Sequence, residues 1–324
     1  MQSTLPRALV AGEAVVTLDT FQKFVCPVDK QLLNLLGDHL ACSACAREFP
    51  LVNGIPILLN EENSVFRIGD YVHRDGYVGA SGYGGSLDRS SGLKKAYRRF
   101  ARKLSEAPVL GDHFNALEYI SKKKPDAKLM VIGAGERSYA GDVTYTDVAL
   151  AKNISCVCDA HDLPFPDDSF DAVIADAVLE HVCDPQRCVS EIHRVLRPNG
   201  FVVATTPFLQ PVHMGAHDFT RFTYLGHRRL FRGFDEIASG QCGGPIYSAI
   251  HLFRDLLLCM TDNLRAQPFL RLLGLLITYP VRYLDYFFSR SLRSYNSACA
   301  FYFFGQKRLS PIPDREIISM FRGR

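Results

Sequence analysis

The feature that most constrains the fold is an alternation of short apolar segments with amphipathic ones between residues 128 and 207. Five segments have the composition of buried strands: KLMVIG (128–133), VTYTD (143–147), ISCVC (154–158), FDAVIAD (170–176) and GFVVATTP (200–207). Between the last two, Asp184 and Pro185 suit the cap and first turn of a helix, and its apolar face carries Cys188, Val189, Ile192, Val195 and Leu196. This alternation predicts an α/β fold with a doubly wound, mostly parallel sheet.

Small and polar residues stand where these strands end. They are Gly133 and Gly135, Asp147, Asp159 and Ala160, Ala175 and Asp176, and the pair Thr205 and Thr206. Ligands of open α/β sheets bind beyond the carboxyl ends of the strands, near a switch in strand order. The sequence therefore predicts a cofactor site along this edge.

The loop after the first strand, in LMVIGAGERSYAGDVTYTD (129–147), narrows the choice of cofactor. A dinucleotide fingerprint needs a third glycine where Ser138 stands, and about 20 residues before its ribose-binding acid. The segment 133–142, which must cross from the first strand to the second, has ten residues. This length is at the lower limit of about 10–12 residues for such a crossover, so it leaves no room for a full helix. Without a helix N-terminus to hold a pyrophosphate, a nicotinamide dinucleotide is disfavoured and a cofactor without phosphate fits better.

From Lys128 to Phe234 the sequence resembles the class I S-adenosylmethionine-dependent methyltransferases, in the group similar to the quinone-biosynthesis methyltransferases. The most specific part is DAHDLPFPDDSFDAVIADAVLEHVCDPQRCVSEIHRVLRPNGFVVATTP (159–207), although Asn199 replaces the first glycine of the family's PGG. The resemblance implies a Rossmann-like seven-stranded sheet and S-adenosyl-L-methionine as the cofactor. It also implies an enzyme that transfers a methyl group.

The resemblance also implies a role for each residue at the strand ends. Gly133, Ala134 and Gly135 would face the methionine part, and Asp147 would accept hydrogen bonds from both ribose hydroxyls. Asp159 would accept a hydrogen bond from the adenine amine, and Ala160 would lie beside the adenine ring. Ala175 and Asp176 would line the methionine end, and Leu179 and His181 would line the rim on the donor side.

Two departures from the family pattern keep a second interpretation open. Val131 stands where the family usually has an acid, and Arg137 stands where its loop has a third glycine. A degenerate methyltransferase fold that serves as a non-catalytic scaffold or partner-binding module would tolerate both changes. Binding of the cofactor separates the enzyme from the scaffold.

The segment TPFLQPVHMGAHDFTRFTYLGHRRLF (206–231) supplies the candidates for the acceptor side. His213 or His217 can serve as a general base, with Asp218 orienting it, and Arg221 can hold an anionic acceptor. The segment is similar to one in relatives linked to glycan or lipid modification, which implies a small acceptor such as a lipid, quinone or glycan precursor. The alternative is that Asp218 and Arg221 form a structural ion pair that fixes the loop.

The N-terminal part contains half of a zinc motif, Cys42-Ser-Ala-Cys45, and an incomplete partner half in which Asp29 follows Cys26. The segment CPVDK…CSACAREFPLVNGIPILL resembles the small zinc-ribbon proteins that activate tRNA and protein methyltransferases, here fused to a larger chain. Cys26, Asp29, Cys42 and Cys45 are therefore candidate ligands of a structural zinc ion. The alternative is a ribbon that has lost its metal and kept its fold.

These observations predict the following organisation: an N-terminal tail (1–21), a zinc-ribbon-like unit (22–60), a linker and basic helix (61–107), a methyltransferase domain (108–308) and a loose C-terminal tail (309–324). The domain carries a helical insertion at 246–292, before its last strand. Large apolar residues and arginines alternate in this insertion. It is therefore a surface for peripheral membrane contact, a lid for a lipid-like acceptor, or an ordinary helical cap packed on the core.

Composition limits the partners and the compartment. A net charge of +3 is too small by itself to indicate a nucleic-acid partner. The cysteines are mostly scattered singly, which favours a reducing, cytoplasmic location over a disulfide framework. The sequence names no protein partner for the ribbon.

Overall fold

The protein is described by a computed structural model that covers residues 21–72, 92, 114–135 and 137–323. Its strands are β1 (Leu33–Leu36), β2 (His39–Cys42), β3 (Glu48–Val52), β4 (Ile55–Leu58), β5 (Leu129–Ile132), β6 (Val143–Asp147), β7 (Cys156–Cys158), β8 (Phe170–Asp176), β9 (Leu196–Pro207), β10 (Phe234–Gln241) and β11 (Ala300–Lys307). Its α-helices are α1 (Gly69–Val72), α3 (Ala116–Lys123), α4 (Pro185–Val195), α5 (Tyr224–Leu230), α6 (Pro245–Cys259), α7 (Gln267–Val281), α8 (Asp285–Phe288) and α9 (Asp314–Ser319).

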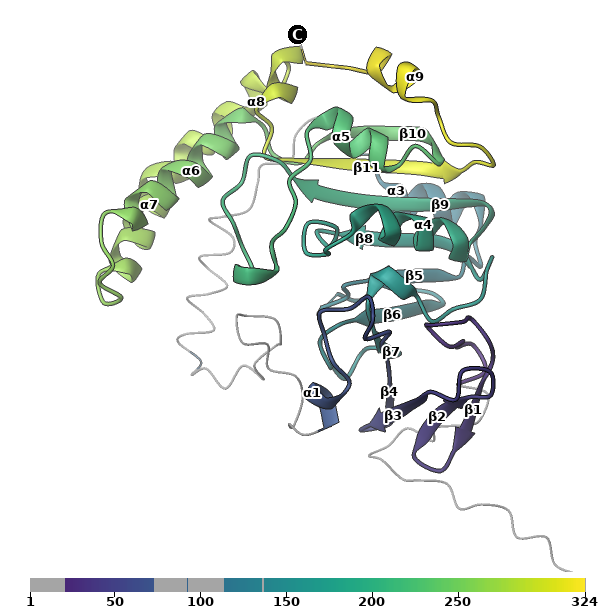
Figure 1. The fold of residues 1–324 in the computed structure, drawn as a ribbon. Helices are drawn as coiled ribbons and strands as arrows, with labels where there is room; N and C mark the ends of the chain where they lie inside the picture. Colours follow the sequence, from purple (N-terminus) through teal and green to yellow (C-terminus); the bar gives the residue numbers. More distant parts are fainter. Residues whose placement is uncertain (1–20, 73–91, 93–113, 136, 324) are drawn as a thin grey trace, which may run out of the picture.

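Seven of these strands form the predicted doubly wound sheet, in the order β7-β6-β5-β8-β9-β11-β10 (Figure 1). The pairs from β7 to β9 are parallel, and only β11 runs antiparallel to its neighbours β9 and β10. The order reverses between β5 and β8, which is the switch point where such sheets bind ligands. The predicted fold class, including the helical insertion before the last strand, is confirmed.

The local signals in the sequence explain the central elements. All four residues of β5 are buried, as expected for a strand covered on both faces. Asp184 caps α4 by accepting a hydrogen bond from the Arg187 backbone N–H, and Pro185 occupies the first turn. The sheet has helices on both faces, because α4 packs on the side of Met130 and Ile132 while α3 packs on the opposite side.

The ribbon extends this sheet. β1, β2, β3 and β4 form an antiparallel meander, and β4 pairs in parallel with β7, with Ile57 opposite Val157 and Leu58 opposite Cys158. The result is one continuous eleven-stranded sheet, with the ribbon at the lower end in Figure 1. The sequence predicted two separate units and did not predict this edge-to-edge pairing.

The segments that flank the sheet differ in part from the prediction. The basic helix expected in the second part of 61–107 lies outside the described residues. α3 begins at Ala116, where the Asn115 side chain caps it by accepting a hydrogen bond from the Glu118 N–H. The expectation of a loose tail was wrong, since α9 forms there and its Asp314 pairs with Arg229 at 2.9 Å.

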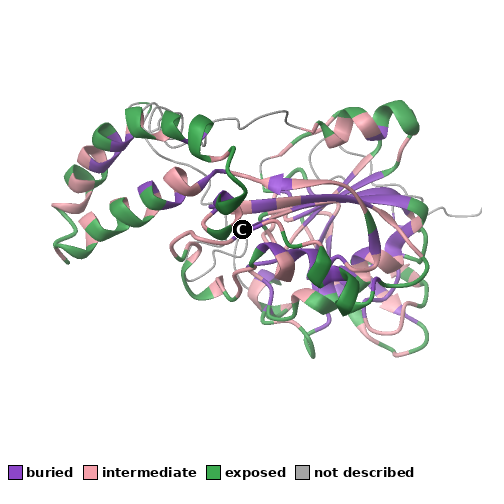
Figure 2. Ribbon diagram, turned by 90° about the horizontal axis from the view of Figure 1, so that it is seen from above, coloured by how far each residue is buried: buried purple, intermediate pink, exposed green. Residues whose placement is uncertain are grey.

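The insertion forms an arm of two antiparallel helices, α6 and α7, that projects away from the sheet (Figure 1). The helices pack closely on each other, since a Cβ on Gly274 would lie only 3.2 Å from Leu257 Cδ1. Much of the arm is exposed (Figure 2). None of the helices among the described residues has the length and hydropathy to span a bilayer.

Candidate cofactor site

A cavity of about 390 Å³ lies at the carboxyl edge of the sheet, beside the switch between β5 and β8. This size is in the range of small-molecule sites. Six of the residues predicted for the cofactor line it: Gly133, Gly135, Asp147, Asp159, Ala160 and His181. The cavity is where the sequence places the cofactor.

The turn after β5 has the geometry that its glycines predict. Gly133 and Gly135 have φ angles of +63° and +53°, a region that favours glycine. A Cβ on Gly133 would also lie 2.6 Å from Val178 Cγ2, so a side chain there would collide with the opposite wall of the cavity. No helix forms in the described part of residues 133–142, as the short crossover predicted.

Asp147 ends β6 with its carboxylate on the cavity. Its Oδ2 accepts a hydrogen bond of 2.8 Å from the Gly135 N–H, and its Oδ1 accepts one of 2.9 Å from the Ala149 N–H. Burial raises the pKa of Asp147, and the backbone hydrogen bonds oppose that rise. These two bonds fix the direction of the carboxylate, and each oxygen keeps acceptor capacity for a further donor.

The carboxylate of Asp159, which follows β7, accepts hydrogen bonds from two side chains of the protein that the sequence did not predict as its partners. Its Oδ1 accepts a hydrogen bond of 2.5 Å from His161 Nδ1, and its Oδ2 accepts one of 2.6 Å from the Ser64 hydroxyl. The Asp184 N–H donates to His161 Nε2 at 2.9 Å, so the His161 proton is on Nδ1. Burial raises the pKa of Asp159, but hydrogen bonds from His161 and Ser64 outweigh it and leave the pKa below its ordinary value.

Four of the predicted residues do not line the cavity. Ala134, Ala175 and Leu179 are completely buried in the core, and Asp176 forms an ion pair with Arg137. Sequence reasoning also missed Val65 and Phe66, which do line the cavity. No local signal could have found them, because they belong to a segment that was expected to be a linker.

The acceptor-side candidates lie on a loop after β9, and the structure separates them. His213 lines the cavity, whereas His217, Asp218 and Arg221 do not. Both carboxylate oxygens of Asp218 bind the Arg221 guanidinium, and Oδ2 also accepts from the His213 N–H at 2.7 Å. Hydrogen bonds from Arg221 and His213 outweigh burial and lower the pKa of Asp218. The Arg221 guanidinium is therefore already paired with Asp218 inside the loop.

A family model described as a methyltransferase domain matches residues 127–204, which begin just before β5 and end within β9. The chain contains a class I methyltransferase domain. The resemblance found in the sequence is thereby confirmed for residues 127–204, which supply most of the cavity lining.

Two curated relatives show how far the likeness of this methyltransferase domain extends. An uncharacterized methyltransferase of Mycolicibacterium vanbaalenii is 44% identical over 68 residues, which cover 21% of this chain and 26% of the relative. A ubiquinone/menaquinone biosynthesis C-methyltransferase, UbiE, of Geotalea daltonii is 31% identical over 124 residues, which cover 35% of this chain and 53% of the relative. The chain thus spans between a quarter and about half of the length of these relatives.

Solved methyltransferase structures also align with the chain. The phosphoethanolamine N-methyltransferase 2 of Haemonchus contortus, in complex with S-adenosyl-L-methionine, aligns with a TM-score of 0.36 and 16% identity. The alignment covers 65% of this chain and 56% of that one.

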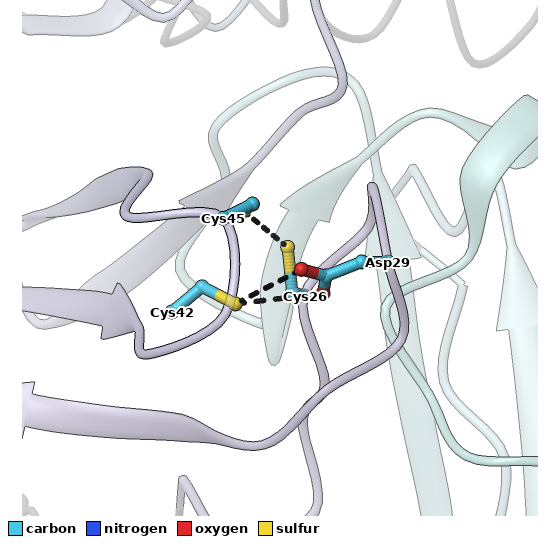
Figure 3. A group of neighbouring side chains, drawn as sticks. All are labelled: Cys26, Asp29, Cys42 and Cys45. Atoms are coloured by element: carbon cyan, nitrogen blue, oxygen red, sulfur yellow. Dashed lines mark hydrogen bonds between the residues drawn. The ribbon is translucent and has the colours of Figure 1, made fainter.

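Beside the methyltransferase domain, the ribbon brings its four candidate ligands together (Figure 3). The ligand atoms of Cys26, Asp29, Cys42 and Cys45 all lie within 4.8 Å of one another. The sulfurs of Cys26 and Cys45 are 3.7 Å apart, and Cys42 Sγ lies 3.3 Å from Asp29 Oδ2. Three thiols and one carboxylate in this arrangement have the ligand types and number of a closed structural zinc site.

Proposed function

We propose that the chain is an S-adenosyl-L-methionine-dependent methyltransferase that acts on a small acceptor. The observation that carries the proposal is the cavity at the switch point, where the Asp147 carboxylate faces a glycine turn that has no helix behind it. A half-buried acid suits the hydroxyls of a ribose, and the absence of a helix N-terminus among the described residues of this loop disfavours a pyrophosphate.

The residues present fit this cofactor. Asp147 would hold the ribose hydroxyls, the backbone at Gly133 and Gly135 would leave room for the methionine part, and Ala160 would contact the adenine ring. Asp159 would accept from the adenine amine through the acceptor capacity that Ser64 and His161 leave unused. When bound, the cofactor supplies a methyl group already activated on a sulfonium, so the protein's main tasks are to align the acceptor and exclude water.

The acceptor is proposed to be a small lipid, quinone or glycan precursor. Its support is the likeness to the relative named a ubiquinone/menaquinone biosynthesis C-methyltransferase, together with the His-rich loop after β9. Of the two histidines predicted as a base, His213 has the better position because it lines the cavity. The ion pair between Arg221 and Asp218 favours a structural role for these two residues over binding of the acceptor.

Calorimetric titration of the purified chain with S-adenosylmethionine and with its demethylated product tests the proposal. We expect saturable binding that is lost in Asp147→Ala and retained in Asp235→Ala, which removes an exposed acid on β10. A folded native chain that binds neither ligand would favour the scaffold interpretation. Unchanged binding in Asp147→Ala would contradict the assignment of the site.

We also propose that the ribbon holds a structural zinc ion through Cys26, Asp29, Cys42 and Cys45. The convergence of the four side chains supports it. Because four protein ligands leave no open position, the metal would stabilise the ribbon and take no part in the transfer.

A third proposal concerns the α6–α7 arm, which would make peripheral contact with an anionic membrane. Leu252 and Leu256 lie four residues apart on α6, and Met260 directly follows the helix at the same spacing; they are 52%, 63% and 72% exposed. The whole arm, residues 245–281, carries three arginines and two aspartates. An exposed apolar stripe with basic residues beside it is the composition of an interfacial helix. The reaction is proposed to occur on the cytoplasmic side of such a membrane, since the described cysteines are free thiols.

A further inference from the structure

Glu180, in the turn between β8 and α4, has a side chain that the cofactor site does not explain. It is completely buried, and neither carboxylate oxygen has a hydrogen-bond partner among the described residues. A buried polar group without partners costs free energy, and a buried charge costs more unless it is paired or binds a metal. We therefore expect a ligand that compensates the buried Glu180 carboxylate.

Two histidines face the Glu180 carboxylate. His181 Nε2 lies 3.7 Å from Glu180 Oε1, and His213 Nε2 lies 3.6 Å from the same oxygen. The two imidazole rings meet edge to face, with centroids 4.7 Å apart. A tetrahedral ion with bonds of about 2.1 Å holds its ligand atoms about 3.4 Å apart, so the three groups need only small movements to share one ion.

The second nitrogen of His181 has the partner that a metal ligand usually has, and that of His213 lies beside a carboxylate. His181 Nδ1 donates a hydrogen bond of 2.7 Å to the His217 carbonyl oxygen. His213 Nδ1 lies 3.4 Å from the Asp218 carboxylate and also 3.4 Å from Arg221 Nη2, and these two groups pair with each other. Metal-binding histidines almost always donate their other ring N–H to a carbonyl or carboxylate, which orients the ring and fixes the tautomer.

The backbone holds the two halves of this cluster together. The N–H groups of Phe219 and Thr220 donate to the Glu180 carbonyl oxygen at 2.8 and 3.2 Å. These bonds attach the loop after β9, which carries His213, to the turn after β8. The cluster is thus positioned by main-chain contacts, without depending on an ion.

We propose that Glu180, His181 and His213 bind a divalent transition-metal ion beside the cofactor cavity. Two imidazoles and one carboxylate suit zinc, manganese or iron, and three protein ligands leave positions open. Because His181 and His213 line the cavity, the open positions face it.

The proposal assigns the ion a role that rests on the proposed methyltransferase function. A hydroxyl of the acceptor would bind at an open position, where the ion would lower the pKa of the hydroxyl and the proton would pass to solvent. The deprotonated oxygen would form a bond to the methyl carbon as the carbon–sulfur bond breaks, and the electron pair of the broken bond would stay on sulfur, which becomes a neutral thioether.

Mn²⁺ is the probe of choice, because carboxylate and imidazole bind it better than the ribbon's thiolates do. Full-length protein is treated with a chelator, desalted and titrated with Mn²⁺ in the absence of cofactor, and free Mn²⁺ is followed by electron paramagnetic resonance. We expect one ion per chain. Glu180→Gln and His213→Gln should each weaken binding at least about 10-fold, since even outer-shell changes cost 10–100-fold.

Two controls separate this site from other acidic or thiol groups. His39→Gln, which removes a half-buried histidine beside Asp38 and Glu48, should leave Mn²⁺ binding unchanged. Cys42→Ser, in the ribbon, should do the same. Thermal melting shows whether each variant folds. If Glu180→Gln does not fold, His213→Gln decides the test, because the His213 side chain is partly exposed and its replacement should leave the fold intact.

Absence of Mn²⁺ binding by the native chain, or equal binding by the native chain and His213→Gln, overturns the metal site. Neither result depends on the cofactor. Conversely, Mn²⁺ binding together with a failure to bind S-adenosylmethionine refutes the proposed function and leaves the metal site standing.

Discussion

The Arg137 guanidinium donates a hydrogen bond of 2.8 Å to the Asp176 carboxylate and one of 3.2 Å to the Gly133 carbonyl oxygen. These contacts join the loop after β5 to the end of β8, on the two sides of the switch point. Arg137 stands where the family has a third glycine, and in this chain it ties the glycine turn to the neighbouring strand.

Replacement of Arg137 by alanine tests whether this tie shapes the cofactor site. Because both partners of the ion pair are well exposed, we expect the free energy of unfolding to fall by less than about 1 kcal/mol. The glycine turn would lose its anchor, so the dissociation constant of S-adenosylmethionine should rise roughly tenfold, or about 1.4 kcal/mol. Denaturant unfolding and calorimetry measure the two effects.

Arg308→Ala is the matched control, since Arg308 pairs with Asp235 at 3.1 Å on an exposed surface. It should change stability by a similar amount and leave cofactor binding unchanged. Equal cofactor affinity in Arg137→Ala and the native chain would show that the turn holds its shape without Arg137.

Removal of the proposed zinc ion from the ribbon should affect the cofactor site as well. β4 pairs with β7, and Ser64, just beyond β4, donates to Asp159. We therefore expect a chelator to lower the melting temperature and to weaken cofactor binding several-fold. Elemental analysis should show one zinc equivalent fewer in Cys45→Ser than in the native chain. The exposed Cys183 provides the control Cys183→Ser, which should keep its zinc.

His227 on α5 predicts a pH dependence of stability. Burial, and to a lesser degree the charge of Arg228, lower the pKa of His227 to about 3. The unfolded chain, with an ordinary pKa of about 6.5, binds the proton first, so stability is lost as the pH falls below that value. The contribution of His227 to this loss is roughly 2 kcal/mol between pH 7 and pH 5.

His227→Phe should remove that contribution, because the ring already contacts Phe231 and Phe303 edge-on and an aromatic replacement fits there. Urea unfolding of both proteins at several pH values measures the difference. If the free energies of unfolding of the two proteins fall in parallel from pH 7 to pH 5, His227 is not the group responsible.

The α6–α7 arm predicts binding to anionic vesicles. Leu256→Asp on α6 and Phe269→Asp on α7 alter side chains that are 63% and 67% exposed, so neither should reduce stability much. Burial of one such side chain stabilises by about 1.5–3 kcal/mol, so each change should weaken binding at least about tenfold in a flotation assay. Leu309, 98% exposed and outside the arm, provides the control Leu309→Asp. Equal flotation of all four proteins would contradict the proposal.

The central sheet and its glycine turn were predictable because their signals are local. β6 and β8 have the bounds that the sequence indicated, and Asp184 caps α4 as expected. The position of Asp147 on the cavity follows from the same reasoning, since a residue at the end of a parallel strand lies at the carboxyl edge of the sheet. Strand periodicity and capping require information from only a few neighbouring residues.

The pairing of the ribbon with β7, the entry of Phe66 into the cavity wall and the meeting of Glu180 with His213 were decided by the tertiary structure. Each joins segments that are distant in the chain, through a strand edge or a loop that folds back over the sheet. The sequence by itself determined the α/β order, the residues at the strand ends and the type of cofactor they suit. It did not determine which loops meet, because that depends on how the finished sheet brings its edges and crossovers together, and no local periodicity encodes it.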